Sequence, residues 1–89
     1  MRIPDYTNQF KRDYKASKKQ RLNMSLLDKV LTDLIEENPL DKKYKDHPLV
    51  GDYYGCRECH ILSDWLLIYQ LGEGAVVFHR TGTHSKLFG

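Results

Sequence analysis

The chain has 89 residues, of which 40% are hydrophobic and 29% are charged. These values exclude a disordered chain and indicate a single folded domain over residues 1–89. Fourteen Lys and Arg residues against twelve Asp and Glu residues give a net charge of +2. The sequence has no long apolar run and no secretory signal. We therefore expect a cytoplasmic protein with reduced cysteines and no membrane contact.

The first predicted elements are a strand over residues 2–6 and a helix over residues 8–19. Pro4 favours an edge position for the strand, because proline cannot donate a hydrogen bond to a neighbouring strand. Phe10 and Tyr14 mark the buried side of the helix. The other face is basic and predicts an anionic partner, either nucleic acid or an acidic protein. The alternative is a basic helix face that only contacts solvent. Its basic residues are Lys11, Arg12, Lys15, Lys18 and Lys19.

A second helix follows and shows the strongest periodicity of the chain. Its apolar residues recur at helical spacing, at Leu27, Val30, Leu31 and Leu34. Asn23 or Ser25 can cap its first turn, and the Asn38-Pro39 pair stops it. The short connection between the two helices predicts an antiparallel helical hairpin.

Three antiparallel strands are predicted after a polar loop over residues 40–51. They span residues 53–61, 65–71 and 75–81. The nearly continuous apolar run of the middle strand is typical of a central strand that is buried on both faces. The order β-α-α-β-β-β predicts an α+β domain, with a small antiparallel sheet and the helical hairpin packed on one face.

The segment Cys56-Arg57-Glu58-Cys59-His60 has the spacing of a c-type haem attachment motif and contains ligands that suit zinc or redox chemistry. It falls within a predicted strand, where residues three apart point to opposite faces of the sheet. Cys56 and Cys59 are therefore expected to be buried free thiols, and no metal site is predicted.

Three histidines are predicted to lie in loops or at strand ends, where functional sites are commonly built. His47 is in the polar loop, His60 ends the first strand of the group, and His84 follows the last strand. Asp64 stands in the turn after His60, and Arg80 closes the last strand. Histidine exchanges protons near neutral pH, and a guanidinium stabilises a phosphate that gains negative charge. The set therefore suits RNA cleavage by acid–base catalysis without a cofactor.

Four segments in this order, residues 45–49, 55–60, 64–69 and 80–89, closely resemble the YafQ-type toxins of the RelE superfamily. The resemblance implies a RelE-like fold and the toxin half of a type II toxin–antitoxin pair. Such toxins bind the ribosomal A site and cut mRNA there, preferring adenine-rich codons. Cleavage leaves a 2′,3′-cyclic phosphate and a 5′-hydroxyl and needs no metal. The implied partners are a cognate antitoxin, mRNA and the ribosome.

The resemblance also implies roles for individual residues. Six positions match functional positions of the family, His47, His60, Asp64, Arg80, His84 and Phe88, and Trp65 matches its tryptophan. His84 would be the general acid that protonates the leaving 5′-oxygen, Arg80 would hold the phosphate, and Phe88 would position the RNA. The general base is left open among His47, His60 and Asp64. Trp65 offers a stacking face for a base but fits a core position equally well.

Two further expectations complete the interpretation. The basic face of the first helix would contact ribosomal RNA, and His79 matches no functional position of the family and is expected to be exposed. The alternative is a non-enzymatic toxin of the related ParE type, which inhibits DNA gyrase. Such a toxin does not need His84 together with Arg80. A metal- or haem-binding module built on Cys56 and Cys59 is the other alternative.

Overall fold

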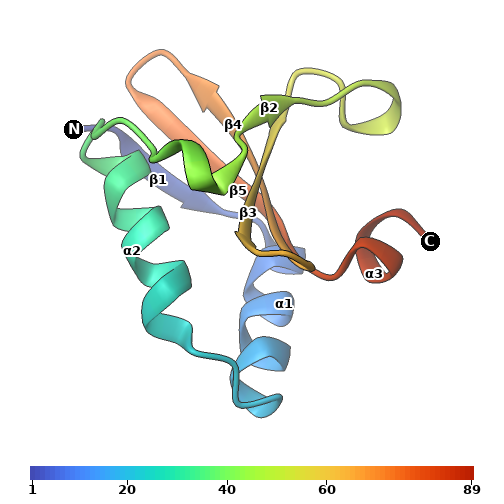
Figure 1. Cartoon of the computed structure of the whole chain (residues 1–89). Helices are drawn as coiled ribbons and strands as arrows, with labels where there is room; N and C mark the ends of the chain where they lie inside the picture. Colours follow the sequence, from blue (N-terminus) through green and yellow to red (C-terminus); the bar gives the residue numbers. More distant parts are fainter.

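The computed structural model describes all 89 residues as a five-stranded sheet with two long helices on one face (Figure 1). The strand order is β1-β5-β4-β3-β2; β1 runs parallel to β5, and the other neighbours are antiparallel. No helix is long and apolar enough to cross a membrane. In chain order the elements are β1 Ile3–Tyr6, α1 Asn8–Lys19, α2 Met24–Ile35, η1 Lys42–Tyr44, β2 His47–Pro48, η2 Gly51–Tyr53, β3 Arg57–Leu62, β4 Trp65–Gly72, β5 Ala75–Gly82 and α3 His84–Phe88.

The helical hairpin forms as predicted, with α1 and α2 side by side across the sheet. The Thr7 hydroxyl accepts a hydrogen bond from the Phe10 backbone N–H at 3.0 Å, and the Asn23 side chain accepts one from Ser25 N–H at 3.3 Å. These caps satisfy donors that have no partner inside a helix. The buried residues of α2 are those that the periodicity predicts: Leu27, Val30, Leu31 and Leu34.

The central position of β4 is also confirmed. Its side chains alternate between two apolar clusters on opposite faces of the sheet. Trp65, Leu67 and Tyr69 pack into the larger cluster, which the helices cover. Leu66 and Ile68 belong to the smaller cluster on the other face. Burial of these five residues on both faces explains why the segment is almost entirely apolar.

The structure corrects the predicted start of β3 and adds a short strand beside it. The strand begins at Arg57 and not at residue 53, because residues 51–53 form the short helix η2 and Gly55 turns the chain with a φ of +91°. Within the predicted polar loop, His47 and Pro48 form the fifth strand, β2, which pairs with the start of β3. The direct consequence is that His47 lies opposite Glu58.

Cys56 and Cys59 are both buried free thiols, and they lie on opposite faces of the sheet as predicted. Cys59 packs in the cluster under the helices, where burial raises its pKa to about 12. Cys56 packs in the smaller cluster, and burial raises its pKa as well. The two sulfur atoms therefore belong to different cores.

Candidate active site

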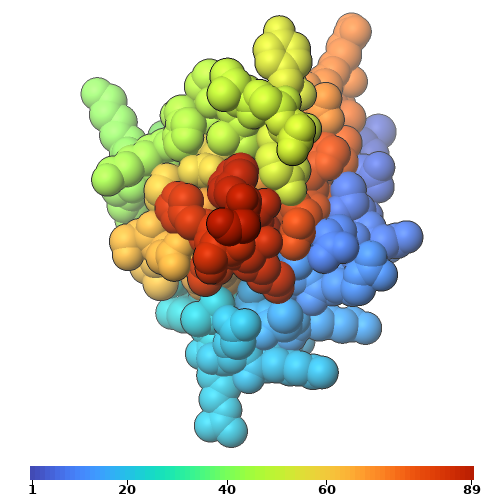
Figure 2. Space-filling model, turned by 90° about the vertical axis from the view of Figure 1, so that its right-hand side faces the viewer, coloured from blue at the N-terminus to red at the C-terminus, as the bar shows by residue number.

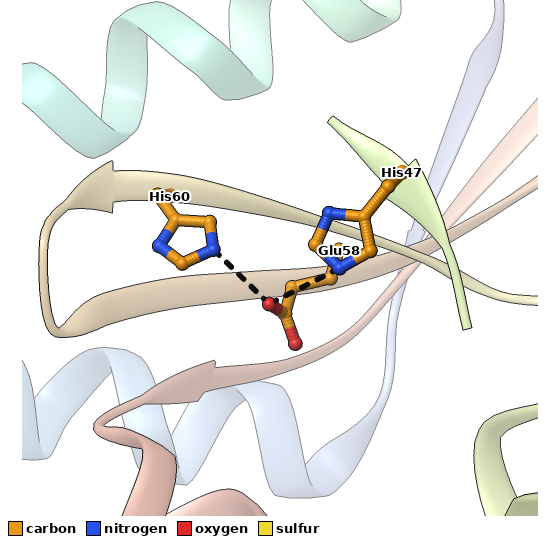
Figure 3. Close-up of side chains that lie close together, drawn as sticks. All are labelled: His47, Glu58 and His60. Carbon is orange, nitrogen blue, oxygen red and sulfur yellow. Dashed lines mark ion pairs between the residues drawn. The ribbon is translucent and has the colours of Figure 1, made fainter. Parts of the chain in front are cut away.

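A buried carboxylate lies between two histidine rings at the junction of β2 and β3 (Figure 3). Glu58 Oε1 is 3.6 Å from His47 Nε2 and 3.3 Å from His60 Nε2, and only 6% of the Glu58 side chain is exposed. Glu58 and His60 are two residues apart on β3, so they share a face of the strand. His47 joins them through its pairing with Glu58 across the two strands.

Backbone carbonyls set the orientation of both rings. His47 Nδ1 is 2.7 Å from the Lys45 carbonyl oxygen, and His60 Nδ1 is 3.3 Å from that of Ser63. A carbonyl only accepts, so each Nδ1 carries the hydrogen, and each Nε2 is left to exchange a proton beside Glu58. These three side chains also offer ligand atoms within 4.8 Å of one another, so they are the residues that could hold a metal ion.

His84, the first residue of α3, is held by a second carboxylate. Asp64 Oδ1 accepts hydrogen bonds from the backbone N–H and the Nδ1 of His84, both at 2.9 Å. These two bonds hold the pKa of Asp64 below its usual value. Because Nδ1 donates to the carboxylate, Nε2 of this half-exposed ring is free to give a proton to a substrate atom.

The rings of the three histidines lie close together. The helix α3, which carries His84, lies at the centre of the face shown in Figure 2. The ring centroids of His47 and His60 are 6.1 Å apart, and those of His60 and His84 are 5.7 Å apart. The ring of Phe88 lies 6.3 Å from that of His84 and packs edge-on against Tyr53. Residues that are 41 positions apart in the sequence, from 47 to 88, thus form one cluster.

A hollow of about 460 Å³ opens beside His60. Its walls combine apolar side chains, such as Ile61 and Leu62, with the cationic side chains of Lys43 and Lys45. Apolar surface suits a base, and lysine suits a phosphate, so this hollow is compatible with one nucleotide of an RNA strand.

Arg80 reaches the cluster through other residues. Its Nε donates to Asp13 Oδ2 at 2.7 Å and its Nη2 to Asp13 Oδ1 at 3.3 Å. This hydrogen bonding raises the pKa of Arg80, and the Tyr53 hydroxyl beside the guanidinium adds to the effect. Tyr53 in turn contacts Phe88, which connects Arg80 to α3.

Trp65 occupies the core position that the sequence left open as an alternative. It is 3% exposed and packs under the helices, and its indole N–H donates to the Thr81 hydroxyl at 3.0 Å. Its ring therefore has no open face on which a base can stack. His79 is half-buried, not exposed as predicted, and its Nε2 lies 3.0 Å from Gln70 Oε1. The basic residues of α1 are all exposed: Lys11, Arg12, Lys15, Lys18 and Lys19.

Sequence reasoning missed three residues around the site. Glu58 belongs to the cysteine motif, although its two-residue spacing from His60 is a signal for a shared strand face. Asp13 is the only acidic residue of α1 and lies three residues after the buried Phe10, which places it toward the buried side. Tyr53 carries no such signal, because its contacts with Arg80 and Phe88 depend on the tertiary fold.

Comparison with known proteins agrees with the resemblance seen in the sequence. Residues 2–89 match the family described as the bacterial toxin of type II toxin–antitoxin system, YafQ. The mRNA interferase toxin YafQ of Escherichia coli K12 is 43% identical over 86 residues, which cover 96% of this chain and 94% of that protein.

Solved structures give the same result. The toxin in the crystal structure of the E. coli DinJ-YafQ complex superposes with a TM-score of 0.94 at 42% identity, and all of both chains is covered. A metal-bound toxin from Helicobacter pylori superposes with a TM-score of 0.91 at 41% identity, covering 99% of this chain and all of that one. The chain therefore belongs to the YafQ family of bacterial toxins of type II toxin–antitoxin systems.

Proposed function

We propose that this toxin is an endoribonuclease that cleaves mRNA in the ribosomal A site by metal-free acid–base catalysis. The observation that carries the proposal is the convergence of His47, His60 and His84 with two carboxylates on one face. The E. coli relative named an mRNA interferase gives independent support. In this proposal the toxin acts on ribosomes, so it works in the cytoplasm.

In the proposed mechanism the two proton transfers fall to two separate sets of side chains. His84, oriented by Asp64, is the general acid that protonates the leaving 5′-oxygen. The pair His47 and His60, with Glu58 between them, takes the proton of the attacking 2′-hydroxyl. Each transfer contributes about 10²- to 10⁴-fold to the rate. Because both rings contact the same carboxylate, we assign the base role to the pair and not to one ring.

Two further residues act on the RNA in this mechanism. Arg80 stabilises the negative charge that develops on the phosphate in the transition state. Phe88, which is half exposed next to His84, supports a base close to the scissile bond. Attack by the 2′-hydroxyl leaves a 2′,3′-cyclic phosphate on one product and a 5′-hydroxyl on the other.

The test is primer extension on a translated mRNA after brief induction of the protein. We expect in-frame cuts, enriched at adenine-rich codons, that require translation of the message. Fragments with a 5′-hydroxyl should accept phosphate from polynucleotide kinase without prior dephosphorylation. Growth arrest with intact mRNA would contradict the proposal and would favour a gyrase-directed toxin.

The partners follow from the same proposal. The DinJ-YafQ complex contains a toxin and a second protein, and a cognate antitoxin is the corresponding partner of this chain. The exposed basic residues of α1 contact ribosomal RNA, because phosphates attract clustered lysine and arginine side chains.

Charge reversal on α1 should weaken ribosome binding. We expect the triple variant Lys15→Glu, Lys18→Glu, Lys19→Glu to lose affinity and to show a smaller dependence of affinity on salt, by about one unit of log–log slope per lost phosphate contact. Co-sedimentation with ribosomes at several salt concentrations measures both quantities. Lys29→Glu on α2 is the control and should bind normally. Unchanged sedimentation of the triple variant would exclude α1 from the interface.

We also propose that a divalent transition-metal ion inhibits the enzyme by binding to His47, Glu58 and His60. Imidazole and carboxylate groups are ligands for zinc and similar ions, and the three ligand atoms lie close enough together. The H. pylori relative described as metal-bound supports this assignment. A bound ion would occupy the ring nitrogens that accept the substrate proton, so it would oppose the reaction.

A further inference from the structure

Asp13 has the most deeply buried charged side chain of the molecule, and no step of the reaction so far involves it. It lies on the buried side of α1 and is 1% exposed, whereas the outer side of the same helix is basic. An unpaired charge in such a position would be strongly destabilising. The contacts of this carboxylate therefore indicate why it is there.

The carboxylate of Asp13 joins two other elements. From β5, Arg80 binds it through Nε and Nη2, and the Thr81 backbone N–H donates to Oδ2 at 3.2 Å. From α3, Lys86 Nζ lies 3.3 Å from Oδ1. Burial alone would raise the pKa of Asp13, but the hydrogen bonds from Arg80, Thr81 and Lys86 hold it below its usual value. These hydrogen bonds therefore stabilise Asp13 in its charged form.

Of the two cationic partners of Asp13, Arg80 is a predicted site residue, and Lys86 lies on α3, the helix that carries His84. Arg80 uses Nε and Nη2 for Asp13, which fixes the plane of the guanidinium. Lys86 lies between His84 and Phe88 in the sequence of α3, a helix of only five residues. Figure 2 shows this segment seated against α1.

Two carboxylates from distant parts of the chain thus hold α3. Asp64, in the turn between β3 and β4, binds the first residue of the helix. Asp13 binds Lys86 one half-turn later. A short terminal helix has few internal hydrogen bonds, so its orientation depends on such contacts. When both carboxylate contacts are formed, the ring of His84 and the guanidinium of Arg80 are held in a fixed position relative to each other.

We propose that Asp13 is a positioning residue that aligns Arg80 and α3 for cleavage of the RNA phosphate. This inference rests on the proposed ribonuclease function. Asp13 does not touch the substrate and acts only through the two cations that it binds. Its negative charge also leaves the group of Asp13, Arg80 and Lys86 with a net charge of +1, sufficient to attract one phosphate.

The test compares Asp13→Asn with Asp28→Asn in the wild-type background. Asp28, on α2, is the control, since its exposed carboxylate also accepts a hydrogen bond from a residue of α1, the Tyr14 hydroxyl at 2.7 Å. Cleavage of ribosome-bound mRNA gives kcat and KM, and thermal unfolding shows the temperature range in which each variant is folded. We expect Asp13→Asn to lower kcat about tenfold or more in its folded range, since small displacements of catalytic groups have large effects. Asp28→Asn should keep the wild-type kcat.

A double variant tests whether Asp13 acts through Arg80. If it does, adding Asp13→Asn to the Arg80→Lys variant should reduce kcat by a smaller factor than adding it to the wild type. Fully additive losses would overturn this route. A wild-type kcat in folded Asp13→Asn, even with a reduced melting temperature, would show a purely structural ion pair and overturn the inference. An inactive wild-type protein would overturn the proposed function itself, so the two failures are distinguishable.

Discussion

Replacing His84 with alanine is expected to slow mRNA cleavage by about 10²- to 10⁴-fold, which is the usual contribution of a general acid. The fold should be little affected, because the ring is half exposed and its side-chain contact is with an exposed carboxylate, Asp64. Single-turnover cleavage on programmed ribosomes measures the rate, and thermal unfolding checks the fold.

His79→Ala is the matched control for this variant, because it removes a histidine that lies outside the cluster and contacts Gln70. It should cleave at the wild-type rate. Asp64→Asn should give an intermediate loss, since the ring keeps its acid function but loses the group that orients it. A His84→Ala variant that cleaves normally would exclude His84 as the general acid.

Stoichiometric zinc is expected to abolish cleavage, and a chelator should restore it. The ion would bind His47 and His60 through Nε2, together with Glu58. Metal-ligating imidazole must be neutral, so the inhibition should weaken as the assay is made more acidic. Cleavage assays across a zinc titration at two pH values, followed by addition of EDTA, measure both effects.

Glu58→Gln tests the assignment of that site. It should weaken zinc binding in calorimetry, because an amide is a poorer ligand than a carboxylate. His79→Ala is again the control and should bind zinc like the wild type. Zinc inhibition that is equally strong in Glu58→Gln and in the wild type would place the ion elsewhere.

Local patterns were sufficient to predict the elements that have a continuous signal. The helical spacing from Leu27 to Leu34 identifies α2, and the apolar run of β4 identifies the central strand. The start of β3 could not be predicted in this way, because the turn at Gly55 interrupts a segment with strand-like composition. The two-residue strand β2 depends on pairing with β3 and has no local pattern of its own.

The site could be predicted only in part for a related reason. His47, His60 and His84 were found through their types and the family resemblance, but their convergence depends on strand pairing and on α3. Glu58 lies inside a motif that suggests haem or zinc chemistry, so the motif itself does not point to its role beside His60. Asp13 could not be assigned a role, since its partner Arg80 is 67 residues away. Long-range charge pairing leaves little trace in a single sequence.

The opposite placement of the two cysteines provides the molecule with a pair of internal reporters. Cys59 lies in the core beneath the helices and Cys56 in the smaller core beside α3, so each thiol reports on one core. A buried thiol reacts only after its surroundings open. The alkylation rate of each cysteine therefore measures how often the core around that cysteine opens. If Cys56 reacts long before Cys59, the smaller core beside α3 opens while the larger core beneath the helices stays closed.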